Sequence, residues 1–284
     1  MAAMFASSCA TEAPKKDMGI QLYSLRELIG NPESYAQNHE AVLQQIADLG
    51  YTAVEAACYS DGLLYGVAPE QFKADCEAAG LEPISSHVVR YLSDEEIANH
   101  DFTAALEWWK EAVAAHKAAG MSYMVAPSIN IPGTLAGLKT VCDYMNEMGA
   151  ICKESGIKFG YHSHSHEFNQ VEGQVAYDFM VENTDPDLVF FQMDVYWAVY
   201  GRVSPVEYFN KYPGRFELLH IKDHYEVGQS GMVGYDAIFR NFDVAGTKAY
   251  IVEMEGSGVG DILETCRISA DYLRNSEFVE ESYR

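Results

Sequence analysis

The sequence predicts an α/β protein built as a (β/α)8 TIM barrel, with eight parallel strands. Short apolar or β-branched runs alternate with helix-like amphipathic runs along the 284-residue chain after Asp17. Parallel strands need a crossover between them, so this alternation predicts a parallel sheet. Eight such units in about 260 residues match the size of this barrel.

The predicted strands are the segments 18–24, 51–57, 82–88, 122–128, 157–163, 188–195, 216–223 and 248–255. The predicted helices between and after them cover 39–50, 69–80, 102–120, 134–156, 174–184, 204–212, 235–242 and 260–276. Gly50, Gly80, Gly120 and Gly156 each end a helix just before the next strand, as a left-handed C-terminal cap does. A doubly wound open sheet is the alternative, but no G-x-G-x-x-G pattern opens the first helix.

The N-terminal segment differs from the rest of the chain. MAAMFASSCATEAPKKD passes from small and apolar residues through Cys9 into a polar stretch with two lysines. This pattern resembles the end of a bacterial lipoprotein signal with Cys9 as the lipidated residue, although it has no basic start and its apolar part is short. An unstructured tail with an ordinary cysteine is the alternative. We therefore expect a tether over residues 1–17 and a single domain over 18–284.

Charge and cysteine content narrow the function classes. The chain carries 42 acidic and 19 basic side chains, a formal charge of −23, which repels phosphate backbones and makes nucleic acid a poor partner. The six cysteines form no C-x-x-C pair, and Cys142 and Cys152 lie too far apart along one predicted helix to bridge. No segment after the N-terminus approaches the ~20 apolar residues of a membrane span.

Polar side chains end the predicted strands, where a barrel places its chemistry. These residues are Gln21, Tyr23, Glu55, His87, Ser128, His162, His164, Asp194, His220, Lys222, Glu253 and Glu255. Side chains alternate along a strand, so His162, Asp194, His220 and Glu253 can all face inward from four successive strands. Two imidazoles and two carboxylates suit Mn²⁺, Zn²⁺, Co²⁺ or Fe²⁺ better than Ca²⁺. We therefore predict one divalent metal site.

Each of these residues also has a structural explanation. A histidine at a strand end can be a hydrogen-bonded rim residue, and Asp194 can cap the loop that follows it. Glu253 can form an ion pair with Lys222. Four ligand-type residues at equivalent heights of successive strands favour the metal interpretation, in which Lys222 contacts a substrate anion or oxyanion.

The ordered segments resemble the sugar phosphate isomerase/epimerase family with a xylose-isomerase-like barrel. They are GIQLYSLR, LGYTAVEAA, GLEPISSH, YHSHSHEF, QMDVYW, LLHIKD, GMVGYDAIF and YIVEME. The resemblance implies a divalent ion held by a Glu, Asp, His, Glu set, whose glutamates move a proton next to a carbonyl. Asp194, His220 and Glu253 match this set, whereas His162 stands in place of the first glutamate.

We therefore expect a metal-dependent sugar isomerase or epimerase that acts through an enediolate on a keto or aldo sugar. The candidate proton-transfer residues are Glu253, His164 and Glu167, with Glu55 as a further candidate. The expected substrate contacts are Gln21, Tyr23, Arg26, Glu55, His87, Trp197 and Lys222. His166 and Glu167 lie where strand gives way to loop, so their direction is open.

Three other functions remain to be weighed. A metal-dependent lyase or dehydratase on a keto sugar or keto-inositol would share the enolate. A non-catalytic sugar-binding protein is less favoured, and an abasic-site endonuclease is disfavoured by the negative charge. A lipidated Cys9 would place the protein at the bacterial cell envelope or in the periplasm; otherwise we expect the cytoplasm. Substrate identity, phosphorylation and oligomeric state stay open.

Overall fold

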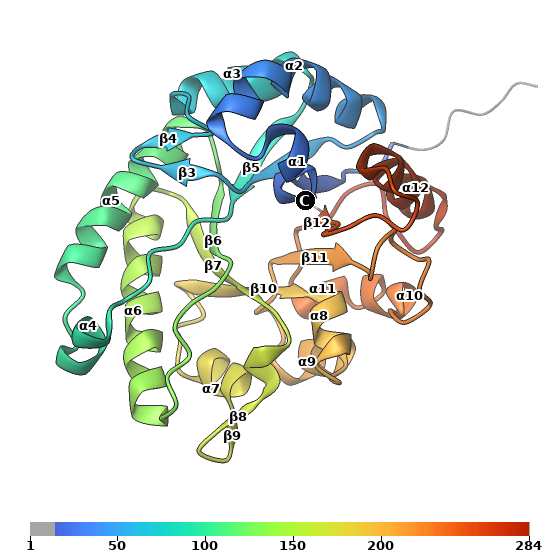
Figure 1. Ribbon diagram of the computed structural model, residues 1–284. Helices are drawn as coiled ribbons and strands as arrows, with labels where there is room; N and C mark the ends of the chain where they lie inside the picture. Colours follow the sequence, from blue (N-terminus) through green and yellow to red (C-terminus); the bar gives the residue numbers. More distant parts are fainter. Residues whose placement is uncertain (1–14, 284) are drawn as a thin grey trace, which may run out of the picture.

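The computed structural model describes residues 15–283 and shows the predicted barrel (Figure 1). An 8-stranded parallel sheet runs in the order β5-β2-β1-β12-β11-β10-β7-β6. The strands are β1 (Gly19–Gln21), β2 (Ala53–Ala56), β5 (Glu82–Ser86), β6 (Tyr123–Ala126), β7 (Lys158–Ser163), β10 (Val189–Asp194), β11 (Leu218–Lys222) and β12 (Ala249–Glu253). A bridge between His87 and Val125 joins the first and last strands of this order and closes the barrel.

Helices surround the sheet (Figure 1). They are α1 (Arg26–Ile29), α2 (Pro32–Asp48), α3 (Pro69–Ala78), α4 (Asp94–Asn99), α5 (Thr103–Ala118), α6 (Leu135–Glu154), α7 (Ala176–Glu182), α8 (Val195–Tyr200), α9 (Pro205–Lys211), α10 (Tyr235–Phe239), α11 (Phe242–Ala245) and α12 (Ile262–Asn275). Short 3₁₀ turns, η1 (Leu22–Leu25) and η2 (His166–Phe168), follow β1 and β7. Two small hairpins project from the barrel: β3 (Tyr59–Ser60) with β4 (Leu63–Leu64), and β8 (Gln170–Val171) with β9 (Gln174–Val175).

The helix ends agree with the sequence signals. Gly50, Gly80, Gly120 and Gly156 have φ of 94°, 80°, 78° and 77°, so all four take the predicted left-handed conformation. The helix α2 begins earlier than its apolar pattern. Asn31 and the Ser34 side chain form a reciprocal capping box around Pro32, which suits the first helical turn.

The interior of the barrel is layered. Its floor is apolar and contains Ala53, Ile84 and Ile251 on one side and Val125, Phe190 and Leu218 on the other. Gly160 leaves room for this floor, because a Cβ there would lie 2.4 Å from the Phe190 ring. At the next inward-facing position along the strands, the side chains are polar. The barrel interior therefore has an apolar floor beneath a polar mouth.

The start of the described chain packs on the barrel, and the described cysteines form no disulfide. Lys16 is buried and its Nζ donates to the carbonyl oxygens of Leu273 and Ser276, at 3.2 and 2.6 Å, so the chain packs on α12 from this point. Cys9 lies outside the described residues, and so does the proposed lipid anchor. The cysteines within the described part of the chain are all free, as predicted for Cys142 and Cys152. Between residues 15 and 283, no helix is long and apolar enough to cross a bilayer.

Gly149 allows α6 to pack against Leu188, the residue just before β10. A Cβ at this position would lie 2.4 Å from the backbone oxygen of Leu188, which no side-chain rotation relieves. We expect Gly149→Ala to lower the free energy of unfolding by about 1–3 kcal/mol, as measured by urea denaturation. Gly133→Ala is the matched control, since a Cβ there meets no atom within 4 Å. Equal stability of the two variants would contradict this packing.

Candidate active site

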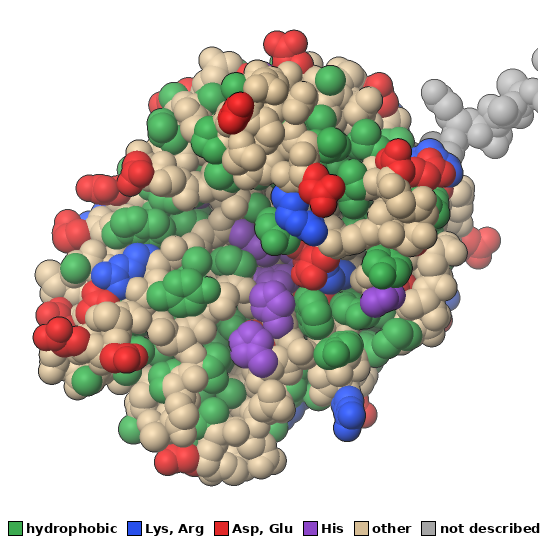
Figure 2. Space-filling model, in the orientation of Figure 1, with side chains coloured by type: hydrophobic (Ala, Val, Ile, Leu, Met, Phe, Trp, Pro, Cys, Tyr) green, Lys and Arg blue, Asp and Glu red, His purple; other side chains and the backbone are tan. Residues whose placement is uncertain are grey.

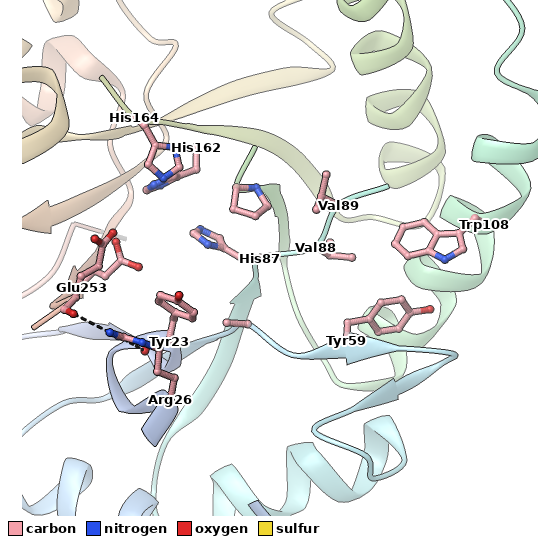
Figure 3. Close-up of a pocket in the computed structure, with 13 residues that line it drawn as sticks. Tyr23, Arg26, Tyr59, His87, Val88, Val89, Trp108, His162, His164 and Glu253 are labelled. Carbon is pink, nitrogen blue, oxygen red and sulfur yellow. Dashed lines mark hydrogen bonds between the residues drawn. The ribbon is translucent and has the colours of Figure 1, made fainter. Parts of the chain in front are cut away.

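The polar mouth of the barrel opens into a cavity of about 500 Å³. Histidine side chains gather in this hollow, with acidic and basic groups beside them (Figure 2). One end of the cavity is polar and lined by Arg26, His87, His162, His164, Glu253 and Glu255. The other end is lined by Ala57, Tyr59, Val88, Val89, Trp108 and Pro127 (Figure 3). Tyr23 lines it as well, beside Arg26.

The four predicted metal ligands come together at the polar end. His162, Asp194, His220 and Glu253 each offer a ligand atom, and these atoms all lie within 4.8 Å of one another. The sheet register brings this about, because Asp194 pairs with His220 and Lys222 pairs with Glu253 across neighbouring strands. All four residues are buried. Nitrogen and oxygen donors of this kind suit a divalent transition-metal ion.

Asp194 provides an independent test of this fit. Its Oδ1 accepts a hydrogen bond from the Trp197 backbone N–H at 2.9 Å and so caps α8, as the structural alternative expected. Its Oδ2 is buried and has no hydrogen-bond partner among the described residues. Burial raises the pKa of Asp194 to about 7, although the nearby Lys222 cation opposes this shift. A buried oxygen without a partner is costly, and a cation beside it would remove that cost.

Glu55 is the centre of a buried hydrogen-bond network. Its Oε1 accepts from Gln21 Nε2 at 2.8 Å and from His220 Nε2 at 2.6 Å, and lies 3.0 Å from His87 Nε2. Its Oε2 accepts from Ser85 Oγ at 2.6 Å and Gln192 Nε2 at 2.9 Å. Burial alone would raise the pKa of Glu55, but the two histidines hold it well below the ordinary value. Glu55 is therefore a carboxylate that only accepts hydrogen bonds.

This network fixes which nitrogen of His162 and of His220 faces the group of four predicted ligands. Since Glu55 only accepts, the side-chain nitrogen of Gln192 must face it, and Gln192 Oε1 must face the histidines. That oxygen lies 3.0 Å from His162 Nδ1, so His162 Nδ1 carries the proton and Nε2 keeps its lone pair. His220 likewise gives its Nε2–H to Glu55 and turns Nδ1 toward Glu253, at 3.3 Å. Such carboxylate–histidine pairs orient metal-binding imidazoles.

His220 and Glu253 form a tightly coupled pair. Burial would lower the pKa of His220, but the carboxylates of Glu55 and Glu253 outweigh it and raise this pKa to about 10. Burial would raise the pKa of Glu253, whereas Lys222 and His220 hold it well below its ordinary value. The ring of His220 therefore carries both protons when no metal replaces one. A metal ion at Nδ1 would displace the proton that faces Glu253.

Lys222 contributes a fixed cation beside these ligands. Its Nζ lies 3.0 Å from Glu255 Oε1 and 3.5 Å from Glu253 Oε2, and 5.8 Å from the centre of the Trp197 ring. Burial favours the neutral amine, but the neighbouring carboxylates, Glu253 first among them, raise the pKa of Lys222 above its ordinary value. The expected ion pair with Glu253 is thus present, and the amine stays charged next to the cavity.

His164 and Glu167 occupy different places. His164 lines the cavity, its Nδ1 has no hydrogen-bond partner in the described chain, and burial lowers its pKa, so it is neutral at pH 7. Glu167 is buried behind it, where it accepts from the Tyr161 hydroxyl at 2.6 Å and the His164 backbone N–H at 3.0 Å. Glu167 is outside the cavity lining, and it fixes the backbone that carries His164.

The residues predicted to contact substrate also fall into groups, because some line the cavity and others lie beneath or beside it. Tyr23, Arg26 and His87 line the cavity. Gln21 and Glu55 are fully buried and outside that lining, bonded to each other beneath the imidazoles. Trp197 and Lys222 lie next to the polar end, where the Trp197 ring centre is 5.9 Å from that of His164. Their predicted contact with substrate stays untested.

Sequence reasoning missed Gln192, Ser85, Tyr59 and Trp108. Gln192 carried a signal, because it shares its strand face with Asp194 two residues later. Ser85 did not, since a bulge between Val54 and Glu55 shifts the pairing of β2 with β5. Tyr59 and Trp108 lie on a hairpin and a helix outside the barrel strands, so no strand-end pattern marks them.

A protein-family model and solved structures match this chain. The family model described as xylose isomerase-like TIM barrel matches residues 43–276. A crystal structure of a sugar phosphate isomerase/epimerase from Parabacteroides distasonis is 35% identical, with a TM-score of 0.84, covering 99% of this chain and 100% of that one.

Curated and more distant relatives carry other names. An inosose dehydratase from Geobacillus kaustophilus is 27% identical over 209 residues, which is 69% of this chain and 65% of the relative. The chain therefore matches slightly less than two thirds of that enzyme. The structure of an IolI protein with a bound zinc atom is 15% identical with a TM-score of 0.66, covers 93% of this chain and 98% of that one, and shows the shared fold.

Proposed function

This chain belongs to the xylose isomerase-like TIM barrel family, and on that premise we propose that it is a metal-dependent sugar isomerase or epimerase. Relatives in the family are named as epimerases and dehydratases. The observation that carries the proposal is the buried group of His162, Asp194, His220 and Glu253 at one end of a ligand-sized cavity. The expected reaction is removal of a proton from the carbon next to a sugar carbonyl.

His162, Asp194, His220 and Glu253 would hold one divalent ion. When bound, such an ion would polarise a carbonyl oxygen and stabilise the negative charge of an enediolate. Zn²⁺, Mn²⁺, Co²⁺ and Fe²⁺ all suit two imidazoles and two carboxylates. Gln192 accepts from His162 Nδ1, which leaves the lone pair of His162 Nε2 on the ligand side. Glu55 accepts from His220 Nε2, so Nδ1 is the nitrogen of His220 whose proton the ion would displace.

His164 is the residue best suited to accept the substrate proton. It is a neutral imidazole on the cavity wall. Its Nδ1 is buried, 3.9 Å from Glu167 Oε1, so Nε2 would be the nitrogen that accepts the proton. Glu253 is a weaker base, because its charge is already balanced by His220 and Lys222. The proton goes to His164 and the electron pair moves onto the carbonyl oxygen. Return of the same proton to the neighbouring carbon, with the hydroxyl proton passing to the former carbonyl oxygen, gives the isomer. Epimerisation instead needs a second acid–base group that delivers a proton to the opposite face. Lys222 stabilises the anion.

The charges at the polar end favour an unphosphorylated sugar. Glu253 and Glu255 both line the cavity, and Lys222 is balanced by them. The Arg26 guanidinium donates to the backbone oxygens of Tyr23 and Glu255, at 3.2 and 2.8 Å. Arg26 is thus the one Lys or Arg side chain among the described lining residues, beside two carboxylates, so a phosphate group would meet net negative charge there.

Elimination is the second candidate. An epimerase returns the proton from the opposite face and needs a second acid–base group there, whereas His162 replaces the carboxylate expected on the strand-five side. Its Nδ1–H is directed to Gln192, which leaves only the ligand nitrogen. One base and one cation suffice to remove a proton and release a β-hydroxyl group as water. The similarity of this chain to proteins named inosose dehydratase supports this alternative.

Solvent exchange tests the proposal. The protein loaded with Mn²⁺, Zn²⁺, Co²⁺ or Fe²⁺ is incubated in D₂O with a panel of keto sugars, aldoses and inososes, and deuterium at the carbon next to the carbonyl is followed by NMR. We expect exchange with at least one sugar, and His164→Ala should slow it by about 10²–10⁴-fold without loss of bound metal. His166→Ala is the matched control, because His166 is half exposed and outside the cavity lining.

The products separate the candidates. An epimer or ketose–aldose pair supports the isomerase, and loss of water supports the dehydratase. Absence of exchange on every sugar would reject proton abstraction and leave a sugar-binding protein. Equal exchange by His164→Ala and the unmodified protein would remove His164 from the mechanism.

A further inference from the structure

The cavity is longer than its metal-binding end. It extends from His162 and Glu253 to a wall built by Tyr59 and Trp108, at the opposite end of the same space (Figure 3). We propose that this aromatic end binds a second ring of the substrate, so that the substrate is a glycoside or other two-ring carbohydrate and not a free monosaccharide. This inference rests on the proposed function, since the reacting sugar would occupy the polar end.

Tyr59 is held in place by a rigid hairpin. Asp61 and Gly62 in the β3–β4 turn have φ of 51° and 80°, as the two central residues of a type I′ turn require. The Tyr65 hydroxyl accepts a hydrogen bond from the Ala57 backbone N–H at 2.9 Å, which ties the end of the hairpin to the strand β2 side of the cavity. Tyr59 therefore belongs to the fixed wall of the cavity.

Trp108 completes this wall from α5. Its ring meets that of Tyr59 edge to face, with the ring centres 5.6 Å apart and the planes at 82°. Both side chains are only partly buried, although they pack against the core. Rings in this arrangement present both a flat face and an edge to whatever lies in the cavity.

The chemistry of the two ends differs. All charged side chains that line the cavity, Arg26, Glu253 and Glu255, lie at the polar end together with the histidines. The far end adds only Ala57, Val88, Val89 and Pro127 to the aromatic pair. The Tyr59 hydroxyl and the Trp108 N–H are the polar side-chain groups of this end, and a phosphate would find no cationic side chain among its described lining residues. A ring with an apolar face, either a pyranose or an aryl group, fits this surface.

The size of the cavity agrees with a ligand of more than one ring. Its volume of about 500 Å³ falls within the ~300–1,000 Å³ that proteins use for drug-sized ligands. The two ends are also parts of one continuous space. A ligand that reacts at the polar end can therefore reach Trp108 through a substituent on the reacting sugar.

The chain contains three tryptophans, and each lies in a different part of the structure, so their NMR signals report on different places. Trp108 lies at the aromatic end, Trp197 lies beside Lys222 and His164, and Trp109 is fully buried with its Nε1 bonded to the Tyr144 hydroxyl. Protein labelled with 5-fluorotryptophan and loaded with Zn²⁺ is titrated with pairs of probes and followed by ¹⁹F NMR. The pairs are D-fructose with turanose, and methyl with phenyl β-D-glucopyranoside. Trp108→Phe and Trp109→Phe assign the signals.

We expect two-ring probes to shift Trp108 and Trp197, one-ring probes to shift Trp197 alone, and Trp109 to move least. A response to turanose or to the phenyl glucoside distinguishes a sugar from an aryl group. A shift of Trp197 by two-ring probes with Trp108 unmoved overturns the second-ring site and leaves the proposed function standing. A shift of Trp108 alone supports the site and contradicts the proposed reaction. If no probe moves either signal, both proposals are rejected.

Affinity gives a second readout. Trp108→Leu keeps an apolar side chain but removes the flat ring, and should weaken the two-ring probe by about 3- to 10-fold, the range of one aromatic contact. The one-ring probe should bind as before. Trp108→Phe should restore most of the loss. Equal weakening of both probes by Trp108→Leu would show that Trp108 only supports the fold, and would overturn the proposal.

Discussion

Asp194→Asn is expected to weaken binding of a divalent ion by at least about 100-fold and, at the same time, to stabilise the metal-free barrel. The carboxylate is fully buried and its Oδ2 has no hydrogen-bond partner in the described chain. Asparagine keeps an oxygen that can cap α8 by accepting from the Trp197 backbone N–H. It removes the buried charge that the ion would otherwise neutralise.

The gain in stability should depend on pH. Burial raises the pKa of Asp194 to about 7, so the folded chain holds this proton more tightly than the unfolded chain, in which an aspartate titrates near pH ~3.9. The destabilising effect of the carboxylate is therefore absent below about pH 4 and fully present above about pH 7. We expect Asp194→Asn to raise the free energy of unfolding by about 2–4 kcal/mol at pH 8 and by almost nothing at pH 4.

Urea denaturation of the metal-free proteins at several pH values, with metal titration by calorimetry, measures both effects. Asp223→Asn is the matched control. Asp223 is also buried, just past β11, but its two oxygens accept from the backbone N–H groups of His224 and Gly228, at 2.8 and 3.1 Å. Its replacement should lower stability and spare the metal. An Asp194→Asn variant that binds the ion normally would refute the ligand assignment.

The fold was predictable because its signals are local. Each strand–helix unit carries its own apolar period, and a glycine at positions such as Gly80 and Gly156 marks the helix end within a few residues. The register of the barrel then converts sequence spacing into proximity. Asp194 and His220 are neighbours because their strands pair at those two residues. The grouping of His162, Asp194, His220 and Glu253 was predictable for the same reason. Their role as metal ligands stays a prediction.

Roles that depend on contacts between distant segments were not predictable. Glu55 ends a strand just as Glu253 does, and only the surrounding donors show that it binds imidazoles and a glutamine. Glu167 follows three histidines, yet the turn η2 directs it back to Tyr161 and the His164 backbone. The wall formed by Tyr59 and Trp108 joins a hairpin to a helix 49 positions away, a pairing without a periodic signal.

Glu55→Gln replaces a single atom of one side chain and is expected to have a large effect on stability. The amide offers one accepting oxygen where Glu55 offers two, so its NH₂ group must face either the histidine side or the Ser85 side of the network. In either orientation of the new amide, its NH₂ group faces another hydrogen-bond donor where Glu55 had an accepting oxygen. Because the buried His220 cation loses one of its two carboxylate partners, we expect the free energy of unfolding to fall by about 3–5 kcal/mol.

The same substitution should change the tautomer of His162. If the new NH₂ group faces Gln192, that amide must turn its oxygen toward residue 55 and its nitrogen toward His162. His162 Nδ1 then has to accept, and the proton moves to Nε2, the nitrogen on the ligand side. An imidazole protonated there cannot bind a metal ion. Metal affinity should fall by about 10- to 100-fold, with all four ligands still present.

Nitrogen NMR of histidine-labelled protein distinguishes this mechanism from general loss of structure, since the two ring nitrogens of each tautomer have different shifts. Ser85→Ala is the matched control, because it removes a single donor to Glu55 Oε2 and leaves Gln192 and both histidines in place. It should cost about 1 kcal/mol and keep the His162 proton on Nδ1 and the metal affinity unchanged. A Glu55→Gln protein that retains the Nδ1–H tautomer and binds metal normally would show that the ligands are oriented by the strands alone, without the buried carboxylate beneath them.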